Sequence, residues 1–98
     1  MNRDQVIATL RLHEPELRAA GVMQLSVFGS TARGDRRPDS DIDLLARFDE
    51  SRRLSLLDVV GIELHLAGLL GQTVDLIEEG TLKPRVQKGV EAETIRAF

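Results

Sequence analysis

Two aspartates open an otherwise apolar segment, and this feature limits how the chain can fold more than any other. Residues 41–48 read DIDLLARF, and Gly29-Ser30 precedes them by ten intervening residues. Side chains of a strand alternate between its two faces, so Asp41 and Asp43 project to the same side while Ile42 and Leu44 face the core. Burying an unpaired carboxylate costs on the order of several kcal/mol. The two aspartates therefore need either solvent or a cationic partner, and a divalent metal fits that requirement.

The chain has the size and composition of one small globular domain. It contains 98 residues, of which 42% are hydrophobic and 30% charged, and we expect residues 1–98 to form a single domain. No apolar run approaches the ~20 residues of a membrane-spanning helix. The first 21 residues lack the apolar run and cleavage site of a signal peptide, so we expect a cytoplasmic protein.

Net charge and cysteine content exclude several kinds of function. A formal net charge of −3 makes strong binding to nucleic acid unexpected, because such binding depends on Lys and Arg contacts with phosphates. The absence of cysteine excludes disulfides, thiolate-bound zinc and cysteine nucleophiles. Any bound metal must therefore be held by oxygen or imidazole ligands.

Hydrophobic periodicity and the positions of Gly and Pro predict six main elements in the order α-β-β-α-β-α. Pro15 either kinks the first helix or restarts it, and Gly21 ends it. We expect an α+β fold with a small mixed sheet and helices on one face. The predicted elements are a helix over 3–19, strands over 22–29 and 41–48, a helix over 54–70, a strand over 73–79, a helix over 83–93 and a short pairing segment over 95–98.

The helix over 54–70 has the strongest pattern. Ser55 or an upstream residue caps its start, and Gly71 ends it. Its periodicity predicts an amphipathic helix. The residues that we assign to its apolar face are Leu56, Leu57, Val60, Leu64 and residues 66–69.

The aspartate pair has the ligand chemistry of a phosphoryl-transfer site. Two carboxylates ~6–7 Å apart on one strand can bind a shared divalent ion, or one each of two ions ~3.5–4 Å apart. Oxygen-only ligands favour Mg²⁺ or Mn²⁺, and Mg²⁺ usually keeps substrate phosphates among its ligands. Gly29 permits close approach of the backbone to a phosphate, Ser30 offers a hydroxyl, and Arg33 can pair with phosphate oxygens.

A third acid is expected on the strand beside 41–48. Asp75 lies in the segment TVDLI, with apolar neighbours on both sides that face the other way. A carboxylate there can serve as a metal ligand and as the general base on an attacking hydroxyl. Glu63, on a helix, and Glu78, near a strand end, are weaker candidates for the same position.

These motifs resemble a known family over nearly the whole chain. Gly29-Ser30, ten residues and then Asp41-Ile42-Asp43 match the G-S-x₁₀-D-x-D signature of the DNA polymerase β-like nucleotidyltransferase superfamily, and the length resembles its minimal (MNT) subgroup. The resemblance implies the polymerase β-like fold and transfer of a nucleoside monophosphate, with ATP as the expected donor and two Mg²⁺ or Mn²⁺ ions on Asp41, Asp43 and Asp75.

The same resemblance implies a macromolecular partner. Many MNT proteins are antitoxins of a HEPN-domain ribonuclease, and some adenylylate a tyrosine on it. Two alternatives stay open: a non-catalytic antitoxin that acts by steric binding, and a small-molecule nucleotidyltransferase that needs a companion subunit. The chain has no Arg-x₄₋₆-His motif of the HEPN type, so a toxin would be another chain. The nucleotide base, the acceptor, the number of nucleotides added and the oligomeric state are left undetermined by the sequence.

Other interpretations of the motif residues fit less well. Gly29-x₄-Gly34 resembles the spacing of a P-loop, but Asp35 stands where that loop requires lysine. An isolated D-x-D is often a solvated strand face, and the Gly-Ser at a fixed distance argues against that reading here. His13 and His65 lie far from the motif in sequence, and we interpret both as structural residues.

Overall fold

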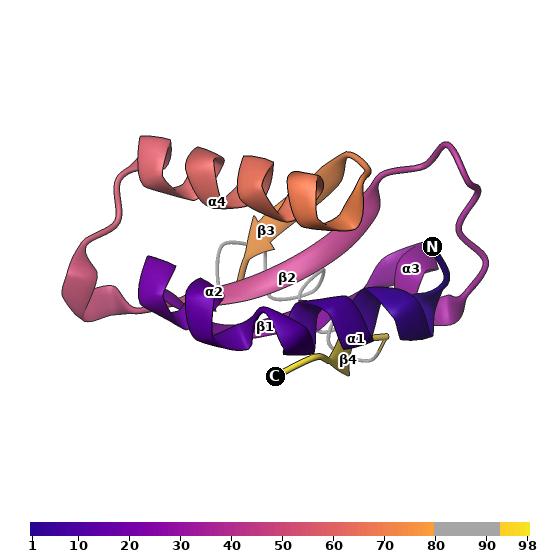
Figure 1. Cartoon of the computed structure of the whole chain (residues 1–98), viewed down its shortest axis with the longest axis horizontal. Helices are drawn as coiled ribbons and strands as arrows, with labels where there is room; N and C mark the ends of the chain where they lie inside the picture. Colours follow the sequence, from indigo (N-terminus) through magenta and orange to yellow (C-terminus); the bar gives the residue numbers. More distant parts are fainter. Residues whose placement is uncertain (80–92) are drawn as a thin grey trace.

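The computed structural model describes residues 1–79 and 93–98, and it arranges the strands of this part of the chain in one mixed sheet of four strands (Figure 1). β1 pairs antiparallel with both β2 and β4, whereas β2 and β3 pair parallel, with a helix connecting them. The predicted α+β class with a mixed sheet is therefore confirmed. The strands, in the order in which they lie side by side, are β3 (Val74–Glu78), β2 (Ile42–Phe48), β1 (Val22–Val27) and β4 (Ile95–Arg96).

Three helices pack on the same side of the sheet (Figure 1). The predicted helix over 3–19 is divided into α1 (Arg3–Leu12) and α2 (Glu14–Ala20). A second helix begins at this point because Pro15 is suited to the first turn of a helix. Gly21 ends α2 with a positive φ of 110°, as the sequence predicts. The third helix, α4 (Leu56–Leu70), crosses from β2 to β3.

The hydrophobic core lies between these helices and one face of the sheet. Alternation along β2 turns Ile42, Leu44 and Ala46 toward the helices, and Asp43 toward the other face. This face polarity fixes the strand register, since a shift by one residue would bury the carboxylate in the core. The helical side chains of the core are Val6, Ile7, Leu10, Leu17, Ile62, Leu66 and Leu70.

Several predicted boundaries differ from the structure. The strand predicted at 41–48 begins at Ile42, so Asp41 lies just before it. Strand β1 ends at Val27, two residues early, and its predicted alternation is interrupted by an irregularity in pairing between Val22 and Gln24. The pairing segment predicted at 95–98 forms β4. The helix predicted at 83–93 lies outside the described residues except for its last residue.

The segment after β1 contains a helix that is absent from the predicted elements. Residues Gly29–Arg33 make a short helix, α3, that ends at Gly34 with a positive φ of 79°. Five residues are too few to show a helical hydrophobic period, so the sequence pattern could not reveal this element. A 3₁₀ turn, η1 (Glu50–Arg52), is also present between β2 and α4.

The assignment of the apolar face of α4 is wrong for most of the residues named. Leu56, Leu57 and Leu64 are 79%, 82% and 67% exposed, and Val60 is 43% exposed. The core-facing stripe is instead Ile62, Leu66 and Leu70. Apolar residues occur around the whole helix, so periodicity alone cannot select the buried side. The predicted cap is confirmed: Ser55 and Asp58 form a reciprocal capping box, and Gly71 ends the helix.

No helix among the described residues is long and apolar enough to cross a membrane.

Candidate active site

The end of β1 and the start of α3 press directly against Asp43. Gly29 has a φ of +58°, which favours glycine, and a Cβ atom at this position would lie 3.1 Å from Oδ2 of Asp43. Both the backbone conformation and the close contact therefore require glycine here. Because position 29 has no side chain, the backbone of Gly29 and Ser30 can lie against the carboxylate of Asp43.

Three hydrogen bonds fasten this junction to β2. The backbone N–H of Phe28 donates to the carbonyl of Asp43 at 3.1 Å, and the backbone N–H of Asp43 donates to Oγ1 of Thr31 at 3.0 Å. The hydroxyl of Ser30 donates to Oδ2 of Asp43 over a longer 3.4 Å. Thr31 is 2% exposed, so its hydroxyl bond is protected from water. Asp43 is thus held at its backbone on both sides and at its side chain.

Asp75 faces Asp43 from the neighbouring strand. The parallel pairing of β2 with β3 puts the two residues at the same register position, and strand alternation turns both side chains to the face opposite the helices. Asp41 immediately precedes β2, where the N–H of Ile42 donates to the carbonyl of Thr73 at 3.0 Å. Asp43 is partly buried, whereas Asp41 and Asp75 are exposed. All three predicted carboxylates therefore gather where β2 and β3 begin.

The crowding of these acids affects the ionisation of Asp43. Partial burial raises the pKa of Asp43 above its ordinary value, and the charges of Asp75 and Asp41 raise it further. The hydrogen bond from Ser30 and the charge of Arg33 act in the opposite direction without cancelling the rise. The site therefore carries negative charge that the described residues do not neutralise.

The chemistry of this donor set fits a hard divalent cation. Carboxylate oxygens are preferred ligands of Mg²⁺ and Mn²⁺, and a cation would relieve the repulsion that raises the pKa of Asp43. In the part of the chain that the structure describes, however, no three His, Asp or Glu side chains converge closely enough to form a complete metal site. The carboxylates are neighbours, and binding a cation requires their side chains to turn toward it.

Arg33 lies at the end of α3, and its side chain is held by two acids that are not part of the aspartate group. Its Nε is 3.2 Å from Oδ2 of Asp35, and one terminal nitrogen is 2.7 Å from Oε2 of Glu93. These two partners raise the pKa of Arg33, with Asp35 the larger influence. The predicted phosphate contact therefore requires Arg33 to exchange at least one of these exposed ion pairs for the ligand.

The weaker acid candidates have other positions. Glu63 on α4 accepts a hydrogen bond from the backbone N–H of Leu76 at 3.4 Å, which links the helix to the sheet. Glu78 is at the last position of β3 and, by alternation, on the opposite face from Asp75. Neither joins the group formed by Asp41, Asp43 and Asp75.

The pocket nearest to α3 is not lined by Asp41, Asp43 or Asp75. Its volume is about 380 Å³, and Arg3, Arg33 and Arg36 line it together with Thr31 and residues at the start of α1. Asp41 and Asp75 are instead open to solvent. The aspartate group is thus accessible to a large acceptor from outside.

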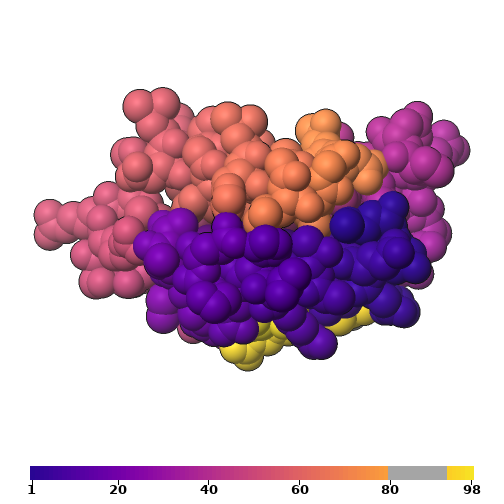
Figure 2. Space-filling model, viewed as in Figure 1, coloured from indigo at the N-terminus to yellow at the C-terminus, as the bar shows by residue number. Residues whose placement is uncertain are grey.

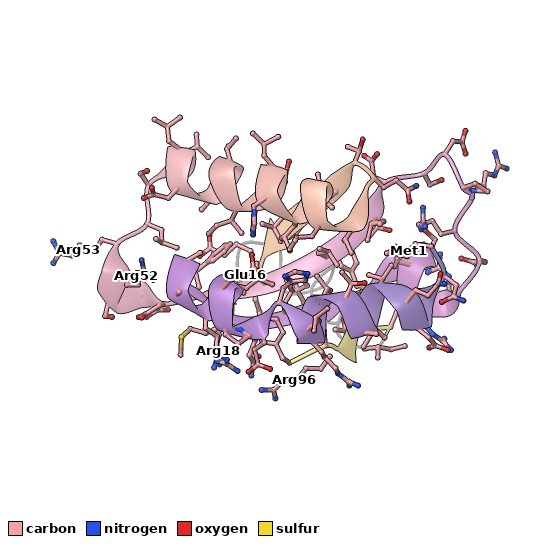
Figure 3. All side chains as sticks on the ribbon, viewed as in Figure 1. Met1, Glu16, Arg18, Arg52, Arg53 and Arg96 are labelled. Carbon is pink, nitrogen blue, oxygen red and sulfur yellow. The ribbon has the colours of Figure 1, made fainter. Side chains whose placement is uncertain are left out.

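The two histidines meet on one glutamate, far from the aspartates. Nε2 of His65 on α4 lies 2.5 Å from one carboxylate oxygen of Glu16, and Nδ1 of His13 contacts the other oxygen. Figure 3 shows Glu16 pointing from α2 into the space toward α4. The hydrogen bonds from His13 and His65 lower the pKa of Glu16. The structural role predicted for both histidines agrees with this position between packed helices.

Thr31 and the backbone of Phe28 were missed in the analysis of the sequence. Thr31 lies between Ser30 and Ala32, and a buried hydroxyl next to the Gly-Ser pair carries no pattern of its own. Its proximity to the Gly-Ser pair is the only signal that could have found it. Its function is visible only once α3 is seen to pack on β2.

Comparison with known proteins gives one consistent result. Residues 10–97 match the nucleotidyltransferase domain family. The protein adenylyltransferase MntA of Thermococcus cleftensis is 39% identical over 93 residues, which cover 94% of this chain and 92% of that protein.

Solved structures agree with this match. A minimal nucleotidyltransferase superposes with a TM-score of 0.82 and 39% identity, covering 97% of this chain and 95% of that one. An MNT antitoxin in complex with a tri-AMPylated HEPN toxin of Shewanella oneidensis has a TM-score of 0.66 at 17% identity, covering 94% of this chain and 71% of that one. At such low identity the second likeness supports the fold alone.

Proposed function

Because the chain belongs to the nucleotidyltransferase domain family, we propose that it transfers AMP from ATP to a hydroxyl group of a partner protein. The observation that carries this proposal is the position of Asp43, which faces Asp75 across β2 and β3 and contacts Gly29 and Ser30 at the start of α3. A carboxylate pair beside a glycine-rich phosphate-binding turn is the arrangement that nucleotidyl transfer requires. The protein adenylyltransferase name of the relative from T. cleftensis supports the choice of AMP.

Each residue of the group has a proposed role. Asp41, Asp43 and Asp75 hold Mg²⁺, two ions in all, and Mn²⁺ can replace it. When bound, the ions neutralise phosphate charge and polarise the α-phosphate. The backbone at Gly29 and the hydroxyl of Ser30 orient the phosphates, and Arg33 leaves Asp35 or Glu93 to pair with phosphate oxygens.

The proposed reaction is an in-line substitution at the α-phosphorus. The acceptor hydroxyl oxygen forms a bond to this phosphorus, and the bond from it to the oxygen that bridges to the β-phosphorus breaks. Pyrophosphate leaves with that bond's electron pair, and the acceptor proton passes to the carboxylate of Asp75. Asp75 suits the role of base because it is exposed on the open side of the aspartate group.

The proposed acceptor is a HEPN-domain toxin, and the chain is then its antitoxin. Structural neighbours include an MNT antitoxin bound to a tri-AMPylated HEPN toxin and a toxin–antitoxin pair solved with AMP-PNP. The exposed position of Asp41 and Asp75 supports an acceptor that approaches as part of a second macromolecule. The residues that the structure describes provide no enclosed site around the aspartates for a small-molecule acceptor.

The proposal is tested by incubating the purified chain with each of four α-labelled nucleoside triphosphates and Mg²⁺, with and without the protein encoded beside it. We expect label from ATP on the neighbouring protein. The Asp41→Asn/Asp43→Asn variant should lose the label. Asp4→Asn/Asp39→Asn removes the same number of charges from exposed acids and should keep it.

The alternatives give different results in the same experiment. A steric antitoxin would bind its neighbour and protect cells, without labelling it and without needing Asp41 or Asp43. A small-molecule enzyme would label a free compound once a companion subunit is added, and the neighbouring protein would remain unlabelled. Either result would overturn the proposed protein adenylylation.

A further inference from the structure

The outer side of α4 exposes more apolar surface than the fold requires. Leu56, Leu57 and Leu64 are each at least two-thirds exposed, and Val60 is also exposed. Figure 2 shows the surface of α4 along the upper edge of the molecule, beside α1 and α2. Clustered exposed leucines on one helix mark an interaction surface more often than scattered single ones do.

Two glycines on the same side of α4 have no purpose within the chain. Neither Gly61 nor Gly68 has a positive φ, so the backbone does not require glycine at either position. A Cβ atom at either one would find none of the described residues within 4 Å, so packing within this part of the chain does not require glycine. Glycine in a helix interior is destabilising relative to alanine. Their presence is explained if another backbone approaches α4 closely from outside.

The spacing of these residues identifies the approaching element. Leu57, Gly61, Leu64 and Gly68 follow one another at intervals of four, three and four residues, so they form one stripe along α4. In an antiparallel pair of such helices, Leu57 lies opposite the partner's Gly68, and Leu64 lies opposite the partner's Gly61. Each of these leucine side chains then lies against a glycine of the partner helix, where no side chain occupies the space. We propose that α4 mediates a symmetric antiparallel dimer of this chain.

Charge complementarity favours the same arrangement. The last turn of α4 contains no basic residue to balance the partial negative charge of the helix C-terminus. Arg52 and Arg53 lie just before α4 (Figure 3) and are exposed. An antiparallel partner brings its own arginine pair beside this C-terminus, and the symmetry makes the contact twice. A parallel pair would instead place the two arginine pairs against each other.

The available area suits a weak, reversible dimer. Burying an exposed leucine side chain removes on the order of 100 Å² from water. The four exposed apolar residues then supply roughly 300 Å² per copy, and the stems of Arg52, Arg53 and His65 along the rim add to it. The apolar residues of two copies together supply roughly 600 Å², so the rim must contribute the rest of the ~1,000 Å² at which specific interfaces begin. We therefore expect dissociation in the micromolar range, measurable by dilution.

Sedimentation of the purified chain across a concentration series tests the proposal. We expect a monomer–dimer equilibrium that Leu64→Glu weakens at least about 100-fold, since a symmetric interface carries each substitution twice. Leu12→Glu is the matched control, because Leu12 on α1 is 76% exposed and lies outside the stripe. The control should leave the equilibrium unchanged.

Gly61→Ala separates an effect on association from an effect on folding. The added methyl group should raise the melting temperature of the monomer, because alanine favours the helix. The same methyl group should weaken dimerisation about 10-fold by keeping the two backbones apart. A variant that only damaged the fold would lower both quantities.

Cysteine cross-linking tests the orientation, since the chain has no cysteine of its own. A mixture of Leu57→Cys and Gly68→Cys chains should form a disulfide dimer. Leu57→Cys alone should not, because its two copies are ~16 Å apart along an antiparallel pair. Monomers at every concentration would overturn the proposal. The proposal would also be overturned if the unmodified chain did not self-associate but bound a different protein, and Leu64→Glu abolished that binding. The surface would then be assigned to that protein.

Discussion

Asp43 and Asp75 occupy the same register position of the parallel pair β2–β3, with both side chains on the face opposite the helices. The two acids come from segments more than thirty residues apart in sequence. Their juxtaposition depends on α4, which returns the chain so that β3 runs parallel to β2. The fold therefore holds two acids in a repulsive arrangement that a bound cation would relieve.

Asp43→Asn should stabilise the metal-free protein while abolishing nucleotidyl transfer. Burial and the charges of Asp75 and Asp41 raise the pKa of Asp43 above the ordinary 3.8. The folded state therefore holds this proton more tightly than the unfolded chain, so stability falls as pH rises through the interval above 3.8. The neutral amide of the Asp43→Asn variant does not titrate, so the variant does not lose stability in this way. In EDTA at pH 7 we expect a melting temperature higher by a few degrees, and no difference between variant and unmodified chain near pH 3.

Mg²⁺ should raise the melting temperature of the unmodified chain. A ligand at ten times its dissociation constant stabilises the folded state by ~1.4 kcal/mol, which corresponds to about 6–11 °C in a domain of this size. The Asp41→Asn/Asp43→Asn variant should show no such shift, whereas Asp4→Asn/Asp39→Asn should keep it. An equal Mg²⁺ response in both variants would place the cation elsewhere in the chain.

The aspartate group was predictable because strand alternation and a fixed loop length are local properties of the sequence. Asp41, Asp43 and the Gly29-Ser30 pair are within fifteen residues of one another, and the position of Asp75 beside Asp43 followed from placing a helix between two parallel strands. The order of the strands and of the longer helices over the described residues followed from the same periodicity. These features depend on short-range patterns, which the sequence displays directly.

The features that were missed depend on tertiary contacts. The core side of α4 is chosen by the position of the sheet, and a helix that is apolar all round does not reveal this choice in its sequence. Helix α3 is too short for a period, and the bond between Thr31 and Asp43 exists only because α3 packs on β2. The salt bridges that hold Arg33 are likewise between residues up to sixty positions apart.

Gly29→Ala should destabilise the protein more than Gly34→Ala. Both glycines have positive φ, 58° and 79°, so alanine is strained at either position. Among the described residues, the new Cβ atom also meets a neighbour at Gly29, Oδ2 of Asp43 at 3.1 Å, and meets none at Gly34. We expect about 1–2 kcal/mol of strain for each substitution and an additional loss of activity for Gly29→Ala. Comparing the thermal melts and transfer rates of the two variants isolates the effect of the contact with Asp43. If both variants behave alike, that contact has a negligible effect.

Glu16→Gln should change the acid stability of the helix layer. The hydrogen bonds of His13 and His65 lower the pKa of Glu16 below its ordinary 4.5, so its contribution to stability is present above pH 4.5 and is lost as pH falls through the lowered value. The melting temperatures of variant and unmodified chain should therefore differ at pH 6 and converge once the pH falls below the lowered pKa of Glu16. Because the group is exposed, high salt should reduce the difference. A difference that persists at pH 3 would indicate a packing effect instead.

Thr31→Val should impair the site although it preserves side-chain shape. Valine removes the acceptor for the backbone N–H of Asp43, and an unpaired buried donor costs about 1–3 kcal/mol. Thr31→Ser keeps the hydroxyl and loses one buried methyl group, at a cost of about 1 kcal/mol. If the bond positions Asp43, serine should retain most of the transfer rate, and valine should lose about 10-fold or more at unchanged ATP affinity. Equal rates and equal melting temperatures for the two variants would show that α3 holds Asp43 without this hydroxyl.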